Sequence, residues 1–116
     1  MLSPTPPGHW IAIALAILGD RKAEIEDRVD ALARLSIAMA DAFIACWRSK
    51  YEYDLLRPVT YIQRLIDPEW RTFLITPPFP EYPSGHSTQS GAAAAVLTSV
   101  FGENHAFSDP THEKEG

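Results

Sequence analysis

Four of the ten prolines stand within the seven residues from Pro77 to Pro83. Proline fixes its own φ angle and has no backbone N–H, so this run cannot form a regular helix or an inner strand. It must be a stiff, extended loop that loses little conformational entropy on folding. The loop leads directly into Ser84-Gly85-His86 and then into an alanine-rich stretch. The sequence therefore predicts a rigid loop that fixes the start of a helix.

Outside this loop, apolar residues recur with helical periodicity, and no strand pattern or internal repeat is convincing. The fold class predicted is all-α, in one small domain over residues 1–116. We predict four helices, at about residues 7–18, 24–53, 58–66 and 84–101. Residues 1–8 form a proline-rich lead-in, residues 103–116 form a polar tail, and residues 69–76 fit either a helical turn or a loop.

Composition excludes several classes of protein. The net charge is -5 and no basic run occurs, so we expect no nucleic-acid partner. Cys46 is the single cysteine, so no internal disulfide can form. The longest apolar runs fall short of the roughly 20 residues of a membrane span. The N-terminus has no basic region of the kind that opens a signal peptide, so we expect a soluble chain of unknown compartment.

The long second helix carries an apolar face and, opposite it, a charged stripe. At 100° per residue, eight residues lie within about 60° of one line. They are Ile25, Val29, Leu32, Ser36, Met39, Phe43, Cys46 and Trp47. The charged stripe holds Asp27, Arg34, Asp41 and Arg48, and we interpret Asp41 as a solvated charge. Lys50 projects from the apolar face, where a lysine either reaches solvent along its own stem or meets an anion.

Arg57 follows Lys50 by seven residues and precedes Pro58. Proline disfavours the helical conformation of the residue before it, so the second helix should break and let Arg57 turn towards Lys50. Pro58 then suits the first turn of the next helix.

These features together predict an oxyanion site. The N-terminus of a helix binds anions through unpaired N–H groups, and Gly85 leaves the backbone accessible. Ser84 adds a hydroxyl, and His86 stands where it could donate or accept a proton. Lys50 supplies a point charge and Arg57 a planar fork of donors.

The two segments Lys50-x6-Arg57-Pro58 and Pro83-Ser84-Gly85-His86 resemble the first two motifs of the vanadium haloperoxidase and type 2 phosphatidic acid phosphatase superfamily. The surrounding residues are similar to its soluble bacterial haloperoxidase-like branch. The resemblance implies that Lys50, Arg57, Ser84 and Gly85 bind vanadate or phosphate, and that His86 is the catalytic acid–base residue. It also implies a halide pocket flanked by Trp47 and Phe79, for which ordinary core packing is the alternative.

The third motif of that superfamily, Ser-Arg-x5-His-x3-Asp, does not occur in these 116 residues. Thr98-Ser99 stand where Ser-Arg is expected, so we interpret His105-x3-Asp109 as a coincidence. We likewise predict no metal site from His105, Asp109 and His112. We therefore expect a partial bundle, the N-terminal portion of such a domain without its C-terminal helices.

Three functions follow as hypotheses, and whether the chain is itself an enzyme stays open. The first is the vanadate-binding part of an enzyme that oxidises halide with peroxide. The second keeps the fold and hydrolyses phosphomonoesters, with phosphate as substrate or ligand. The third is a non-catalytic helical remnant whose uncovered apolar helix faces pair with another chain, for example in a homo-oligomer.

Overall fold

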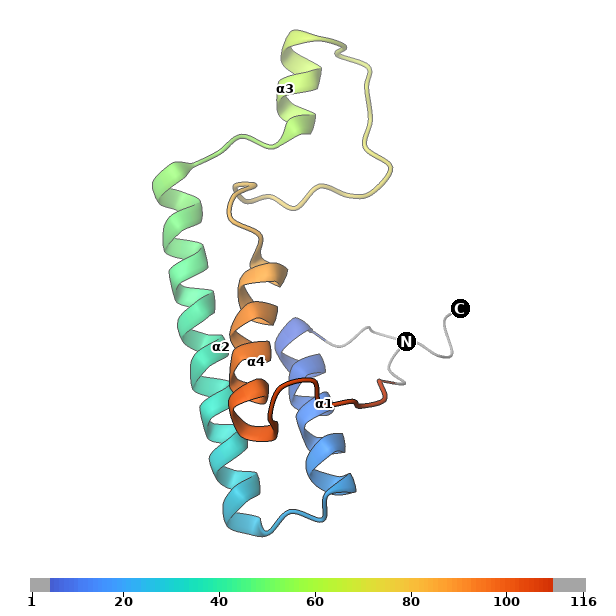
Figure 1. Cartoon of the computed structure of the whole chain (residues 1–116). Coiled ribbons are helices and arrows are strands. Elements are labelled where there is room, and N and C mark those ends of the chain that lie inside the picture. Colours follow the sequence, from blue (N-terminus) through green and yellow to red (C-terminus); the bar gives the residue numbers. More distant parts are fainter. Residues whose placement is uncertain (1–4, 110–116) are drawn as a thin grey trace.

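The computed structural model describes residues 5–109 and is built from helices (Figure 1). They are α1 (Pro6–Asp20), α2 (Ile25–Tyr53), α3 (Pro58–Leu65) and α4 (Gly85–Phe101). No strand occurs in the part of the chain described. The all-α class is confirmed, and each helix lies within two residues of its predicted bounds.

Local chemistry explains where these helices begin and end. The Thr5 hydroxyl accepts a hydrogen bond from the Gly8 N–H at 3.4 Å, and prolines occupy the first turn of α1. α2 ends at Asp54, whose φ of 44° is left-handed and stops the helix. Arg57 is extended, as a residue before proline prefers, and α3 starts at Pro58.

Three of the four helices form the bundle. α2 packs along α4, and α1 packs against both (Figure 1). Small and aliphatic residues from all three fill the core. They are Ile13, Ala14, Ile17, Leu35, Met39, Ala93 and Leu97. α3 contacts none of the other helices, so the predicted four-helix partial bundle is a three-helix bundle with α3 standing apart.

The predicted apolar face of α2 is covered along only one side. Ala31, Leu35, Met39, Cys46 and Lys50 are buried. Ile25 is 65% exposed and Phe43 is 42% exposed, although both belong to the predicted face. Burial is centred roughly 60° away from the predicted line, because α1 and α4 pack on one edge of the face. The rest of that face stays uncovered in residues 5–109.

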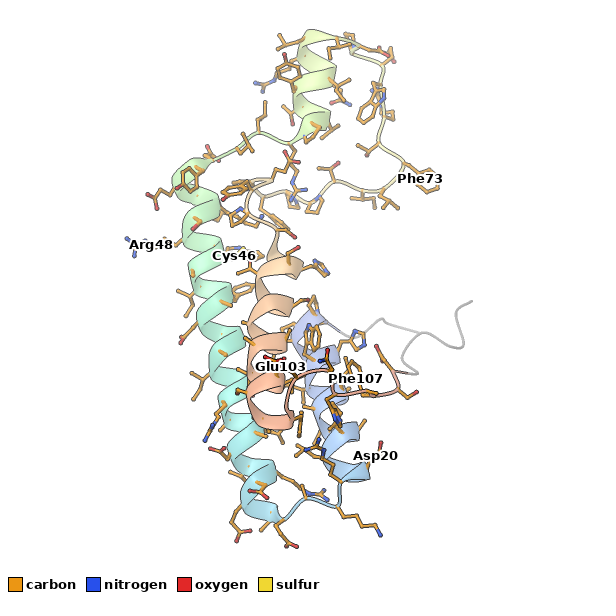
Figure 2. All side chains as sticks on the ribbon, viewed as in Figure 1. Asp20, Cys46, Arg48, Phe73, Glu103 and Phe107 are labelled. Carbon is orange, nitrogen blue, oxygen red and sulfur yellow. The ribbon has the colours of Figure 1, made fainter. Side chains whose placement is uncertain are left out.

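The segment between α3 and α4 is a long loop rather than a helical turn. Residues 66–84 lead from the end of α3, which stands apart, back to the start of α4 in the bundle (Figure 1). Phe73 is 101% exposed and points outward from this loop (Figure 2). The proline run therefore lies where the chain comes back towards α2 and α4, as the sequence predicts.

The tail after α4 is a loop, as predicted, but its described part is fastened to α1. Arg21 donates from Nη2 to the Phe101 carbonyl at 3.2 Å and meets His105 Nδ1 at 3.1 Å. His9 Nε2 lies 2.7 Å from Asp109 Oδ2. His105 and Asp109 thus meet different partners, and His112 lies outside the described residues.

Among residues 5–109, every helix is too short or too polar to cross a bilayer.

Candidate functional site

Lys50 lies in the last turn of α2 and is 1% exposed. Its Nζ donates to the backbone carbonyls of Pro80 at 2.9 Å and Glu81 at 3.1 Å. The inward direction predicted from periodicity is correct, and the alternative in which Lys50 reaches solvent is wrong. Its partners are carbonyls of the proline-rich loop, which the sequence did not predict.

Arg57 turns towards the same loop from the break between α2 and α3. Its Nε donates to the Phe79 carbonyl at 2.6 Å. Its Cζ lies 4.9 Å from the centre of the Phe79 ring, and Lys50 Nζ lies 5.2 Å from the same centre. The predicted approach of the two cations is therefore realised at Phe79, because Pro58 forces the extended conformation on Arg57.

Within residues 5–109, the partners of Lys50 and Arg57 are all uncharged. The ion pairs found within residues 5–109 join His9 to Asp109, Arg34 to Asp30 and Arg71 to Glu69. No carboxylate of that range lies within ion-pair distance of Lys50 or Arg57. A buried ammonium without a counter-ion is costly, and acidic residues outnumber basic ones in this chain. The site thus keeps positive charge that an anion would neutralise.

The second motif begins α4 beside the last turns of α2. Ser84 is the N-cap residue, and its hydroxyl accepts a hydrogen bond from the Ser87 N–H at 3.3 Å. A Cβ added to Gly85 would lie 3.2 Å from a Trp47 ring carbon, so this glycine lets α4 approach α2 closely. His86 is exposed in the first turn of α4. The structure therefore gives Ser84 and Gly85 local packing roles and leaves His86 accessible.

The proline-rich loop is tied to α2 by its backbone. The Glu81 N–H donates to the Leu55 carbonyl at 3.0 Å, and Cys46 Sγ donates to the Pro83 carbonyl at 3.7 Å. Cys46 faces α4, whereas Arg48 points away from it (Figure 2). The ring of Tyr82 packs edge-on against Tyr53. These contacts fix the loop beside the end of α2.

Three aromatic rings form a row along α2 towards the loop. Phe43 stacks on Trp47 with 4.1 Å between ring centres, and Trp47 lies 5.4 Å from Phe79. Trp47 and Phe79 are therefore neighbours. This proximity is expected of residues that flank a halide pocket, and it is equally expected of aromatic residues that pack as a cluster. Both descriptions of these aromatics remain compatible with the geometry.

Phe79 lines two hollows. An apolar groove of about 750 Å³ runs along α2, and six of its lining residues are Met39, Phe43, Ile44, Trp47, Phe79 and His86. A second hollow of about 540 Å³ is lined by Arg57, Phe79 and the prolines at 77, 78 and 80. Lys50 and Ser84 line neither hollow. The structure thus brings Lys50 to Arg57, and Trp47 to Gly85 and His86, but it does not open all of them onto one cavity.

The comparisons with known proteins agree on one family. The family model described as the VCPO second helical-bundle domain matches residues 30–115. The vanadium chloroperoxidase of Curvularia inaequalis is 31% identical in an alignment over 84 residues, and the match covers 60% of this chain and 14% of that protein. The crystal structure of a bacterial vanadium-dependent iodoperoxidase matches with a TM-score of 0.86 and 48% identity, over 97% of this chain and 27% of that one.

This chain therefore spans a minor part of the length of both relatives. The resemblance to vanadium haloperoxidases, predicted from the two motifs, is confirmed by all three comparisons. The matched family residues include the whole of α3, α4 and the proline-rich loop. On the extent of that match, the chain belongs to the family of the VCPO second helical-bundle domain.

Proposed function

We propose that this chain supplies an oxyanion-binding part of a vanadium haloperoxidase-type site, with vanadate as the bound group. The observation that carries the proposal is the pair Lys50 and Arg57, both turned to one loop and both without a carboxylate partner in residues 5–109. Similarity to a chloroperoxidase and an iodoperoxidase supports halide as the substrate class and peroxide as the oxidant.

The residues present fit an oxyanion. Lys50 uses two carbonyls, which leaves the third proton of its ammonium for a ligand. Arg57 uses Nε on Phe79, which leaves the Nη groups to form a fork with two oxygens. The first turn of α4 adds N–H groups at Gly85 and His86 and the positive end of its dipole. Lys50, Arg57, Ser84 and Gly85 would hold the group.

In this proposal the protein residues bind, orient and move protons. Bound vanadate supplies a Lewis-acid centre at which peroxide becomes able to oxidise halide. Lys50 and Arg57 stabilise negative charge on the oxyanion, and the burial of Lys50 and half-burial of Arg57 strengthen that attraction. His86 exchanges a proton with the bound group or with solvent, which its exposure on the groove permits. Trp47 and Phe79 give a halide an apolar surface.

The third motif of the superfamily is not found in this sequence, so we propose binding with little turnover by these 116 residues. The phosphatase alternative uses the same donors on phosphate. Assays of bromide oxidation with vanadate and peroxide, and of aryl phosphate hydrolysis, distinguish the two reactions. Bromide oxidation at an enzymatic rate by the 116-residue chain would contradict the proposed incompleteness.

The binding test is a titration of the chain with orthovanadate and inorganic phosphate, followed by calorimetry and by thermal unfolding. We expect Arg57→Gln to weaken binding by about 10- to 100-fold, because a charged hydrogen bond is lost. Arg48→Gln is the matched control, since Arg48 is exposed and points away from α4 (Figure 2). Equal affinities in the two variants, or no anion-dependent stabilisation of the parent chain, would contradict the proposal.

A second candidate function, association with another copy, is favoured by the apolar groove. The groove is lined by exposed apolar residues such as Phe43 and Ile44, and large apolar surfaces favour association. We expect the parent chain to dimerise and Ile44→Lys to be monomeric in light scattering. Ile37→Lys is the control, because Ile37 is equally exposed on α2 but does not line the groove. A monomeric parent chain excludes this function.

A further inference from the structure

Phe79 contacts both cations of the candidate site. Its ring centre lies 4.9 Å from Arg57 Cζ and 5.2 Å from Lys50 Nζ. Its carbonyl accepts the Arg57 Nε hydrogen bond at 2.6 Å. A single residue therefore meets the guanidinium through ring and backbone, and meets the ammonium through its ring.

We propose that Phe79 is a positioning residue that holds Lys50 and Arg57 in place for an oxyanion without neutralising them. The inference rests on the proposed function, because it adds Phe79 to the machinery of the same site. A carboxylate in this place would hold the cations and also cancel the charge that attracts a ligand. An aromatic face attracts a cation through its quadrupole and carries no net charge.

The Phe79 ring also contacts another aromatic residue of α2. Trp47 lies 5.4 Å from Phe79 between ring centres. Phe79 also lines both the apolar groove and the hollow that contains Arg57. Its ring is thus in contact with Trp47 and Lys50 of α2 and with Arg57 beyond the end of that helix. Since both cations share this ring, a change in the ring alters both at once.

The test weakens the attraction of the Phe79 ring face for cations while keeping the shape of the side chain. Phe79 is replaced by mono-, di- and trifluorophenylalanine in the full 116-residue chain, and dissociation constants for orthovanadate and inorganic phosphate are measured. We expect these constants to rise stepwise, by about 5- to 30-fold for the trifluoro ring. Phe79→Tyr keeps the ring and should restore parent affinity, whereas Phe79→Leu should bind at least as weakly as the trifluoro variant.

Phe43 supplies the matched control. It belongs to the same row of rings but contacts no cation, so its fluorination should leave both dissociation constants unchanged. Tighter or unchanged binding by the fluorinated Phe79 series would overturn the inference. Equal effects at Phe43 and Phe79 would also overturn it, since they would indicate general loosening of the cluster.

A second readout needs no ligand. Proton exchange of Lys50 Nζ and Arg57 Nε is measured by NMR in the anion-free chain, and we expect faster exchange as fluorine is added at Phe79. Faster exchange in a chain that binds neither anion would keep the positioning role and reject the proposed function. Unchanged exchange with parent-like affinities would reject the positioning role and leave oxyanion binding standing.

Discussion

The two ends of the α2–α4 pair are stabilised in different ways. Along residues 31–39, α2 buries alanine, leucine and methionine against α1 and α4. At its other end, Lys50 is held by two carbonyls and by the rings of Trp47 and Phe79, and Arg57 by one carbonyl and the Phe79 ring. The first end is held by apolar burial, which is non-directional. The second is held by directional contacts of charged groups.

Because of this difference, substitutions at the two ends should affect stability and anion binding differently. In the apolar core, a side chain contributes its buried area and has no further chemistry. At the site end, the side chains that hold the loop are also those proposed to hold the oxyanion. A substitution in the core should therefore lower stability and leave anion affinity intact, whereas a substitution at the site end should alter both.

The largest expected effect on stability is in the core. Leu35→Ala removes a side chain that is 0% exposed, and should lower the free energy of unfolding by about 2–5 kcal/mol. Urea unfolding measures this loss. The dissociation constant for orthovanadate, measured where the variant is still folded, should equal that of the parent. A higher dissociation constant would show that core and site are coupled, and would contradict the proposed difference between the two ends.

Lys50→Met should have a smaller effect on stability and a larger one on binding. It leaves the Pro80 and Glu81 carbonyls without their donor, which costs about 1–3 kcal/mol, partly offset because a buried charge is removed. Urea unfolding and orthovanadate titration are measured together. If Lys50→Met is as unstable as Leu35→Ala, yet binds orthovanadate like the parent, then Lys50 contributes to stability and not to binding, contrary to the expectation.

The smallest effect is expected at the start of α4. Ser84→Ala removes the hydroxyl that accepts the Ser87 N–H, and should lower stability by about 1 kcal/mol. Ser84→Asn keeps a capping acceptor and should recover most of that loss. If Ser84 also binds the oxyanion, both variants will weaken orthovanadate binding, although only the alanine variant loses stability. Parent-like binding in both would limit Ser84 to capping.

Much of the local structure could be predicted from the sequence. Prolines and capping residues act on their immediate neighbours, so Pro58, Ser84 and the run from Pro77 to Pro83 mark boundaries that the structure confirms. The inward direction of Lys50 also follows from helical periodicity, because α2 is regular up to Tyr53. The functional roles of the site residues stay predictions.

The packing partners could not be predicted in the same way. The apolar face of α2 is wide, and only the arrangement of α1 and α4 decides which edge of it is buried. Phe79 shows the same limit, because it is 22 residues from Arg57 along the chain and its contact depends on the path of the intervening loop. No periodic pattern in the sequence predicts the path of that loop.

The helix boundaries, the stiff loop and the resemblance to the family can be read from short segments with strong local preferences. The packing of three helices rather than four within residues 5–109, and the contacts of the two cations with the carbonyls and ring of the proline-rich loop, become visible in the folded chain. These contacts join residues that are distant along the chain, so their energies depend on the whole arrangement rather than on neighbouring residues.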